Sequence, residues 1–126
     1  MERGSRKKVV IVDDDRALRD RLQQLLERAG YQVSQAPSGL RLLSLLEVDP
    51  PDLILLDVAM SWISGFELCR AMKANRAYRA IPVVFISGRS SESDIRTGLD
   101  CGADGYFVKP LDTSALLDRM RELATG

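Results

Sequence analysis

The sequence contains no histidine and only two cysteines among its 126 residues. Without histidine, the chain cannot form a histidine-based catalytic triad, a histidine-ligated zinc site or a phosphohistidine of its own. Cys69 and Cys101 lie in no metal-type spacing, and so few cysteines are typical of free, small hydrophobic residues in a reducing compartment. Any phosphohistidine chemistry would therefore have to involve a partner.

The sequence also lacks a net charge and a long apolar run, and we expect its basic start not to be a secretory leader. Eighteen Lys and Arg balance eighteen Asp and Glu, which argues against direct nucleic-acid binding through a basic surface. The basic start MERGSRKK is not followed by the apolar segment of a signal peptide, and no run approaches the length of a transmembrane helix. We therefore expect no membrane contact, a cytoplasmic location and a flexible basic tail over residues 1–6.

Short apolar runs alternate with longer segments of helical period, and this alternation is typical of βαβ units around a parallel sheet. Five strands are expected at residues 9–12, 31–36, 52–57, 81–87 and 105–109. A helix is expected after each strand, and the first of these helices carries an apolar stripe of Leu18, Leu22, Leu25 and Ala29. Because no repeat, low-complexity tract or linker interrupts the pattern, we predict one α/β domain over residues 1–126.

Polar side chains stand where these strands end: Asp13 and Asp14 after the first, then Asp57, Ser87 and Lys109. Open parallel sheets bind ligands beside the carboxyl ends of their strands, so one shared site is the simplest interpretation. Three carboxylates suit Mg²⁺, an aspartate beside the metal can act as a nucleophile toward a phosphoryl group, and a lysine can neutralise the phosphoryl oxygens. Taken singly, each residue could instead be a helix cap, a turn residue or a solvated charge.

Four stretches of the sequence resemble the receiver domains of bacterial two-component response regulators, in that family's order and spacing. They are VVIVDDD, PDLILLDVAMSWISGFELCR, IPVVFISG and GADGYFVKP, and the resemblance covers roughly residues 7–124. It implies a flavodoxin-like (βα)5 fold, with a five-stranded parallel sheet in the order 2-1-3-4-5 and helices on both faces. It also implies a cis peptide bond between Lys109 and Pro110.

The resemblance assigns roles around the strand ends. Asp57 would be the phosphoacceptor, and Lys109 would contact the phosphate. Mg²⁺ would be bound by Asp13, Asp14, Asp57 and the backbone carbonyl of Ala59. The third acid of the run, Asp15, has no such role in the family, so we expect it to cap the helix that follows.

The resemblance further implies a switch, in which Ser87 supplies the switch hydroxyl and Tyr106 the switch aromatic. Tyr106 could instead be an exposed strand residue without a role. The phosphodonor would be a sensor histidine kinase or a phosphotransfer protein. A downstream effector, or a second copy of the chain, would bind the surface of the fourth helix, fifth strand and fifth helix. Such a chain is a phosphoacceptor signalling domain rather than an enzyme, although it assists its own phosphorylation and dephosphorylation.

The loop after Asp57 departs from the family pattern. Ser61 stands where proline is common, and the bulky Trp62 follows it, so the loop is less constrained; Trp62 either packs in the loop or is exposed for binding. A degenerate receiver that binds partners without phosphorylation is therefore an alternative. A flavodoxin-like cofactor binder would offer N–H groups rather than carboxylates after the first strand, and a phosphatase would want a second acid where Ala59 stands.

Overall fold

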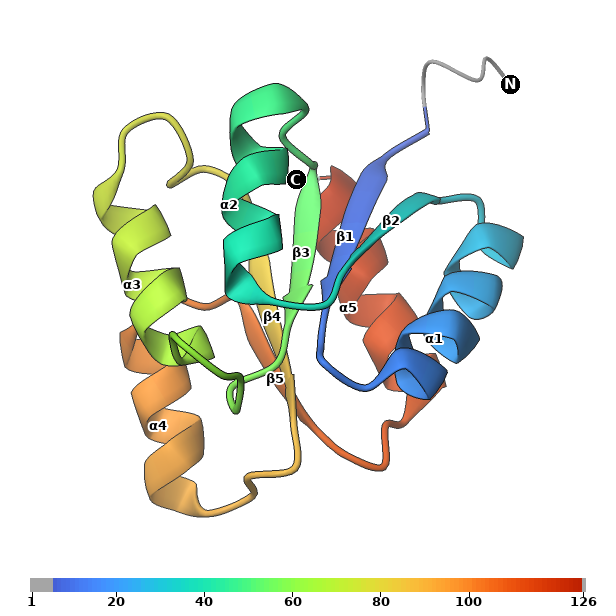
Figure 1. The fold of residues 1–126 in the computed structure, drawn as a ribbon. Helices are drawn as coiled ribbons and strands as arrows, with labels where there is room; N and C mark the ends of the chain where they lie inside the picture. Colours follow the sequence, from blue (N-terminus) through green and yellow to red (C-terminus); the bar gives the residue numbers. More distant parts are fainter. Residues whose placement is uncertain (1–5, 126) are drawn as a thin grey trace.

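Strands and helices alternate along residues 6–125, which are the residues that the computed structural model describes (Figure 1). The strands are β1 (Lys8–Val12), β2 (Gln32–Ala36), β3 (Leu53–Leu56), β4 (Val83–Ser87) and β5 (Gly105–Val108). The helices are α1 (Arg16–Arg28), α2 (Gly39–Val48), α3 (Gly65–Ala74), α4 (Glu92–Asp100) and α5 (Thr113–Thr125). All ten elements expected from the sequence are confirmed. None of these helices is long and apolar enough to cross a membrane.

Some boundaries differ from the expected ones. The fourth strand begins at Val83 rather than at residue 81, because Pro82 has no N–H to donate to a neighbouring strand, although its carbonyl accepts from the Ile54 N–H at 3.0 Å. Of the tail predicted over residues 1–6, only Arg6 lies within the described residues, where it is exposed. The flexibility of this tail and the extent of the domain over residues 1–126 stay predictions.

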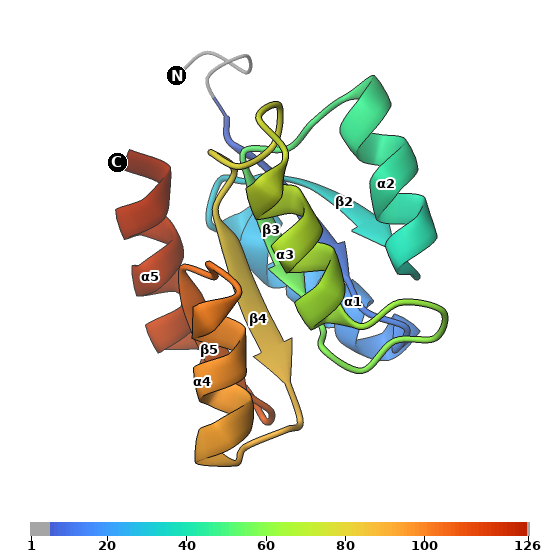
Figure 2. The same cartoon turned by 90° about the vertical axis from the view of Figure 1, so that its left-hand side faces the viewer.

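The five strands form one parallel sheet in the order β2-β1-β3-β4-β5, as predicted. Helices α1 and α5 cover one face, and α2, α3 and α4 cover the other (Figures 1 and 2). The register pairs Val12 with Leu56 and Leu56 with Phe85. The residues that follow β1 and β3 therefore start from the same edge of the sheet, which is the lower edge in Figure 1.

Alternate residues of each central strand enter two separate hydrophobic clusters. In β1, Val10 and Val12 face the cluster that includes α2 and α3, whereas Val9 and Ile11 face the cluster that includes α1 and α5. Strands β3 and β4 are buried along their whole length, since helices cover both of their faces. This burial on both faces explains why the sequences of β3 and β4 are apolar at successive positions.

Three residues of the expected stripe of α1 pack against the cluster of α1 and α5, with Leu22 buried and Leu18 and Leu25 partly buried. The buried residues of the helix are Arg19, Leu22 and Leu26, while Ala29 is exposed. The prediction that Asp15 caps this helix is confirmed, because its side chain accepts a hydrogen bond from the Leu18 N–H at 3.2 Å. The cis peptide bond between Lys109 and Pro110 is also confirmed.

Helix α3 begins in contact with the end of β3. A Cβ atom built on Gly65 would lie 2.2 Å from the carbonyl oxygen of Asp57, so only glycine fits this approach. Ser64 and Glu67 form a capping box that fixes the first turn of the helix. The two ends of the loop between Asp57 and α3 therefore lie against each other, and the capping box fixes the second of them.

Candidate functional site

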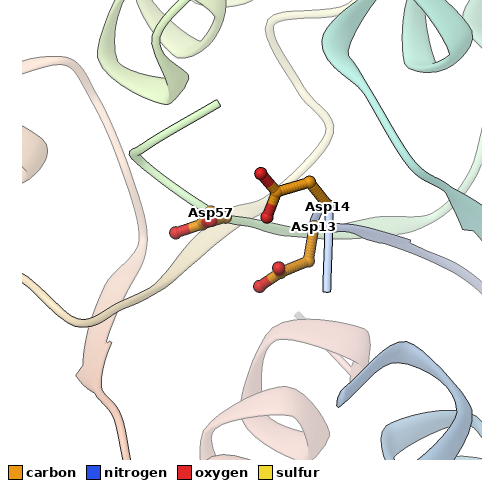
Figure 3. A group of neighbouring side chains, drawn as sticks. All are labelled: Asp13, Asp14 and Asp57. Carbon is orange, nitrogen blue, oxygen red and sulfur yellow. The ribbon is translucent and has the colours of Figure 1, made fainter. Parts of the chain in front are cut away.

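Three carboxylates meet at the carboxyl edge of the sheet. Asp13 and Asp14 follow β1, and Asp57 follows the adjacent strand β3 (Figure 3). Each residue offers one carboxylate oxygen to a group of three in which all the oxygens lie within 4.8 Å of one another. Asp13 and Asp57 are buried, whereas Asp14 is exposed. This all-oxygen donor set, open to solvent on one side, fits a hard divalent cation such as Mg²⁺, which keeps several waters when bound.

Asp13 is held in a fixed orientation. One carboxylate oxygen accepts a hydrogen bond from the Asp15 N–H at 2.9 Å, and the other accepts from Lys109 Nζ at 2.7 Å. Lys109 also lies 3.9 Å from Asp57 Oδ1, so one ammonium group serves both buried acids. The lysine thus offsets part of the repulsion among the three carboxylates.

Asp57 is a carboxyl group whose ionised form is unfavourable in this arrangement. Its burial, followed by the charge of Asp13, raises the pKa of Asp57 from 3.8 to about 6, while Lys109 and a backbone hydrogen bond from Ala59 oppose the rise. A cation bound beside Asp57 would favour the ionised form and lower this pKa. The electrostatics of the site are therefore those of a cation site. The Ala59 carbonyl as a metal ligand stays a prediction.

Ser87 and Tyr106 both contact the loop after β4, and they contact the same residue. The Ser87 side chain is buried, and its Oγ accepts a hydrogen bond from the Arg89 N–H at 3.0 Å. The Tyr106 hydroxyl donates to the Arg89 carbonyl at 2.8 Å, and its ring lies 5.8 Å from that of Phe85. The structure thus brings Asp13, Asp14, Asp57 and Lys109 into one cluster. It places Ser87 at the end of β4 and Tyr106 in β5, where both bond to Arg89.

The sequence interpretation missed Arg19, which lies next to the acidic cluster. This arginine is buried in α1, and its Nη1 atom donates to the backbone carbonyl of Asp13 at 2.7 Å. The signal that could have found it is the spacing of Arg19, Leu22 and Leu26, which places an arginine on the buried face of the helix.

Trp62, in the loop after Asp57, has an unusual backbone conformation. This residue is 71% exposed, and its φ of 77° is the only positive value among the non-glycine residues of the described chain. Left-handed backbone is unfavourable for a bulky side chain. Of the two alternatives for Trp62, the structure therefore favours the exposed one.

Comparisons with known proteins agree with this geometry. The family model of the response regulator receiver domain matches residues 9–121. The response regulator MprA of Mycolicibacterium vanbaalenii is 40% identical over 116 residues, which cover 92% of this chain and 49% of that protein. MprA of Mycobacterium tuberculosis H37Rv is 39% identical, with coverage of 92% and 50%. The chain thus spans about half the length of these relatives.

Solved structures match the whole fold. A response regulator from Chloroflexus aurantiacus, described as putative, superposes with a TM-score of 0.92 at 27% identity and covers 97% of this chain and 100% of its own. The chemotaxis response regulator CheY4 of Vibrio cholerae superposes with a TM-score of 0.86 at 29% identity, with coverage of 94% and 99%.

Proposed function

The chain belongs to the response regulator receiver family, and from this premise we propose that Asp57 accepts a phosphoryl group from a phosphohistidine on a partner protein. The observation that carries the proposal is the cluster of Asp13, Asp14 and Asp57 with Lys109 bound beside them. The donor histidine has to lie outside these 126 residues, because they contain no histidine. A sensor histidine kinase or a phosphotransfer protein fits this requirement.

In the proposed reaction, a carboxylate oxygen of Asp57 attacks phosphorus while the bond from phosphorus to the donor histidine nitrogen breaks. Mg²⁺, held by Asp13, Asp14, Asp57 and the Ala59 carbonyl, would neutralise charge on the phosphoryl oxygens. Lys109 is close enough to both buried acids to turn from Asp13 to a phosphoryl oxygen. The chain is thus a phosphoacceptor that assists its own phosphorylation and dephosphorylation, rather than an enzyme with a separate substrate.

The proposed output is a change of the surface formed by α4, β5 and α5. Ser87 would turn to the new phosphoryl oxygens and Tyr106 would follow it, which requires both to release Arg89. A downstream effector protein or domain would bind the changed surface, and this surface would also suit a homodimer. The proposal includes a cytoplasmic location, which agrees with the free thiols of Cys69 and Cys101.

A degenerate receiver, which binds partners without phosphorylation, is the second candidate. The observation in its favour is Trp62, exposed at a positive φ in the loop directly after Asp57. Such a loop could serve a constitutive contact. The acidic cluster and its lysine argue for the first candidate, because an interaction module has no need to keep two acids buried together.

The deciding experiment is the intact mass of the chain after incubation with Mg²⁺ and acetyl phosphate, compared with the Asp57→Asn variant. We expect a gain of one phosphoryl group that requires both Mg²⁺ and Asp57. No gain, under conditions that label a known receiver, leaves rapid hydrolysis or the degenerate module. Binding of beryllofluoride, a stable analogue of the phosphoryl group, would then identify rapid hydrolysis, and its absence would contradict the proposal.

A further inference from the structure

The backbone of Asp13 is anchored by both of its polar groups. Its N–H donates to the Ala36 carbonyl at the end of β2 at 3.2 Å, and its carbonyl accepts from Arg19 Nη1 at 2.7 Å. The first contact continues the sheet, whereas the second comes from a side chain. Arg19 is only 9% exposed, so this bond is shielded from water. A charged donor makes it stronger than an ordinary neutral hydrogen bond.

Arg19 is itself fixed by Gln35 of β2. The Arg19 Nε atom donates to Gln35 Oε1 at 2.8 Å. The amide group of Gln35 in turn donates to Asp20 Oδ1 at 3.0 Å and to Gln23 Oε1 at 2.6 Å, both on α1. The guanidinium therefore sits in a network that spans α1 and β2 and ends on the Asp13 carbonyl.

From this network we infer that Arg19 is a positioning residue for the metal: it fixes the backbone of Asp13, and thereby the carboxylate that would bind Mg²⁺. The carboxylate takes its own hydrogen bonds from the Asp15 N–H and Lys109, while Arg19 bonds the backbone behind it. The inference rests on the proposed function, because it concerns the cation that the phosphoryl transfer requires. Groups that orient metal ligands in this way contribute about 10-fold to 100-fold to metal affinity.

The sign of the effect separates positioning from simple electrostatics. A guanidinium near three carboxylates repels an incoming cation, so removal of its charge alone would tighten Mg²⁺ binding. If Arg19 acts by holding Asp13, its removal weakens Mg²⁺ binding despite the lost repulsion. Gln35→Met gives an independent test, because it loosens Arg19 without any change of charge.

The experiment is a calorimetric titration of the full chain with Mg²⁺. We expect the dissociation constant to rise about 10-fold in Arg19→Met, less in Arg19→Lys, which keeps the charge and one donor, and in the same direction in Gln35→Met. The matched control is Arg21→Met, which removes an exposed arginine from the same helix and should leave the constant unchanged or slightly lower. Thermal unfolding without Mg²⁺ is recorded for every variant.

Unchanged or tighter Mg²⁺ binding in both Arg19→Met and Gln35→Met would overturn the inference, and so would a lower melting temperature at unchanged affinity, which indicates a structural role alone. If Arg19→Met does not fold, Arg19→Lys and Gln35→Met decide. Labelling of the native chain by acetyl phosphate separates the two proposals. Mg²⁺ binding with neither labelling nor beryllofluoride binding contradicts the proposed function and leaves the role of Arg19 testable, whereas a native chain that binds no Mg²⁺ contradicts both.

Discussion

Replacement of Asp57 by asparagine should stabilise the metal-free protein at neutral pH. Asp57 is 5% exposed, and its surroundings raise its pKa from 3.8 to about 6. Because the folded state holds this proton more tightly than the unfolded state, the stability of the native chain falls as the pH rises from about 4 to about 6. A rise of about two pKa units corresponds to a loss of about 3 kcal/mol that is fully present above pH 6.

An asparagine side chain would keep the shape of the aspartate and carry no charge, so Asp57→Asn should recover up to about 3 kcal/mol at pH 7.5 in the presence of EDTA. The gain should shrink toward pH 4, where the native carboxyl group is protonated. Mg²⁺ should stabilise the native chain more than the variant and so reduce the difference. Urea unfolding at pH 7.5 and pH 4.5, with and without Mg²⁺, measures all three effects.

The matched control for this series is Asp100→Asn, which neutralises an exposed carboxylate at the end of α4. Its stability should differ little from that of the native chain at either pH. The reasoning is refuted if Asp57→Asn is no more stable than the native chain at pH 7.5 without metal, or if its gain is the same at both pH values.

Three further predictions concern backbone positions around the site. Gly65→Ala places a Cβ atom 2.2 Å from the Asp57 carbonyl oxygen, so the free energy of unfolding in urea should fall by about 1 to 3 kcal/mol. An unchanged stability would mean that α3 can move away from β3. Gly98→Ala places a Cβ atom 2.8 Å from the Tyr106 ring, so the ring should change position. Aromatic NMR signals measure this change, and Gly88→Ala, in which the added Cβ meets no atom within 4 Å, is the control. Trp62→Asn should raise the free energy of unfolding in urea by about 1 kcal/mol, because asparagine tolerates the φ of 77° better than tryptophan does. An equal or lower stability would mean that the tryptophan side chain makes compensating contacts.

The sheet and its polar strand ends could be predicted because both follow from local patterns. Uninterrupted apolar runs such as residues 53–56 require cover on both faces, and parallel strands gather their carboxyl ends at one edge. That rule places Asp13 and Asp57 at the same edge, and the strand order, which the family resemblance implied, makes their strands neighbours. Asp15 could be assigned to the helix cap because the family that the sequence resembles gives the third acid of the run no role at the metal site.

The spacing of Arg19 to Leu22 and Leu26 could have suggested that the arginine is buried, but its contact with the Asp13 carbonyl could not be predicted, because that contact depends on the rotation of α1 about its axis. The sequence offers two overlapping stripes, one through Leu18 and Leu25 and one through Leu22 and Leu26, which lie about 70° apart around the helix axis. In the structure both stripes pack against the cluster that includes α1 and α5, but only Leu22 and Leu26 are fully buried, and Arg19 is buried beside them. A partner such as Gln35, which lies on another element, cannot be read from either stripe.

The two proposed switch residues are coupled through Arg89. Ser87 Oγ accepts from its N–H and the Tyr106 hydroxyl donates to its carbonyl, so the two side chains hold opposite sides of one residue. Each such neutral hydrogen bond contributes about 1 kcal/mol, while a hydroxyl bonded to a phosphoryl oxygen forms a charge-assisted bond of roughly twice that strength. In the proposed switch, the move of Ser87 to the phosphoryl group would release the Arg89 N–H and loosen the carbonyl that holds Tyr106. A difference of this size is enough to shift a population between two states that lie within a few kcal/mol of each other.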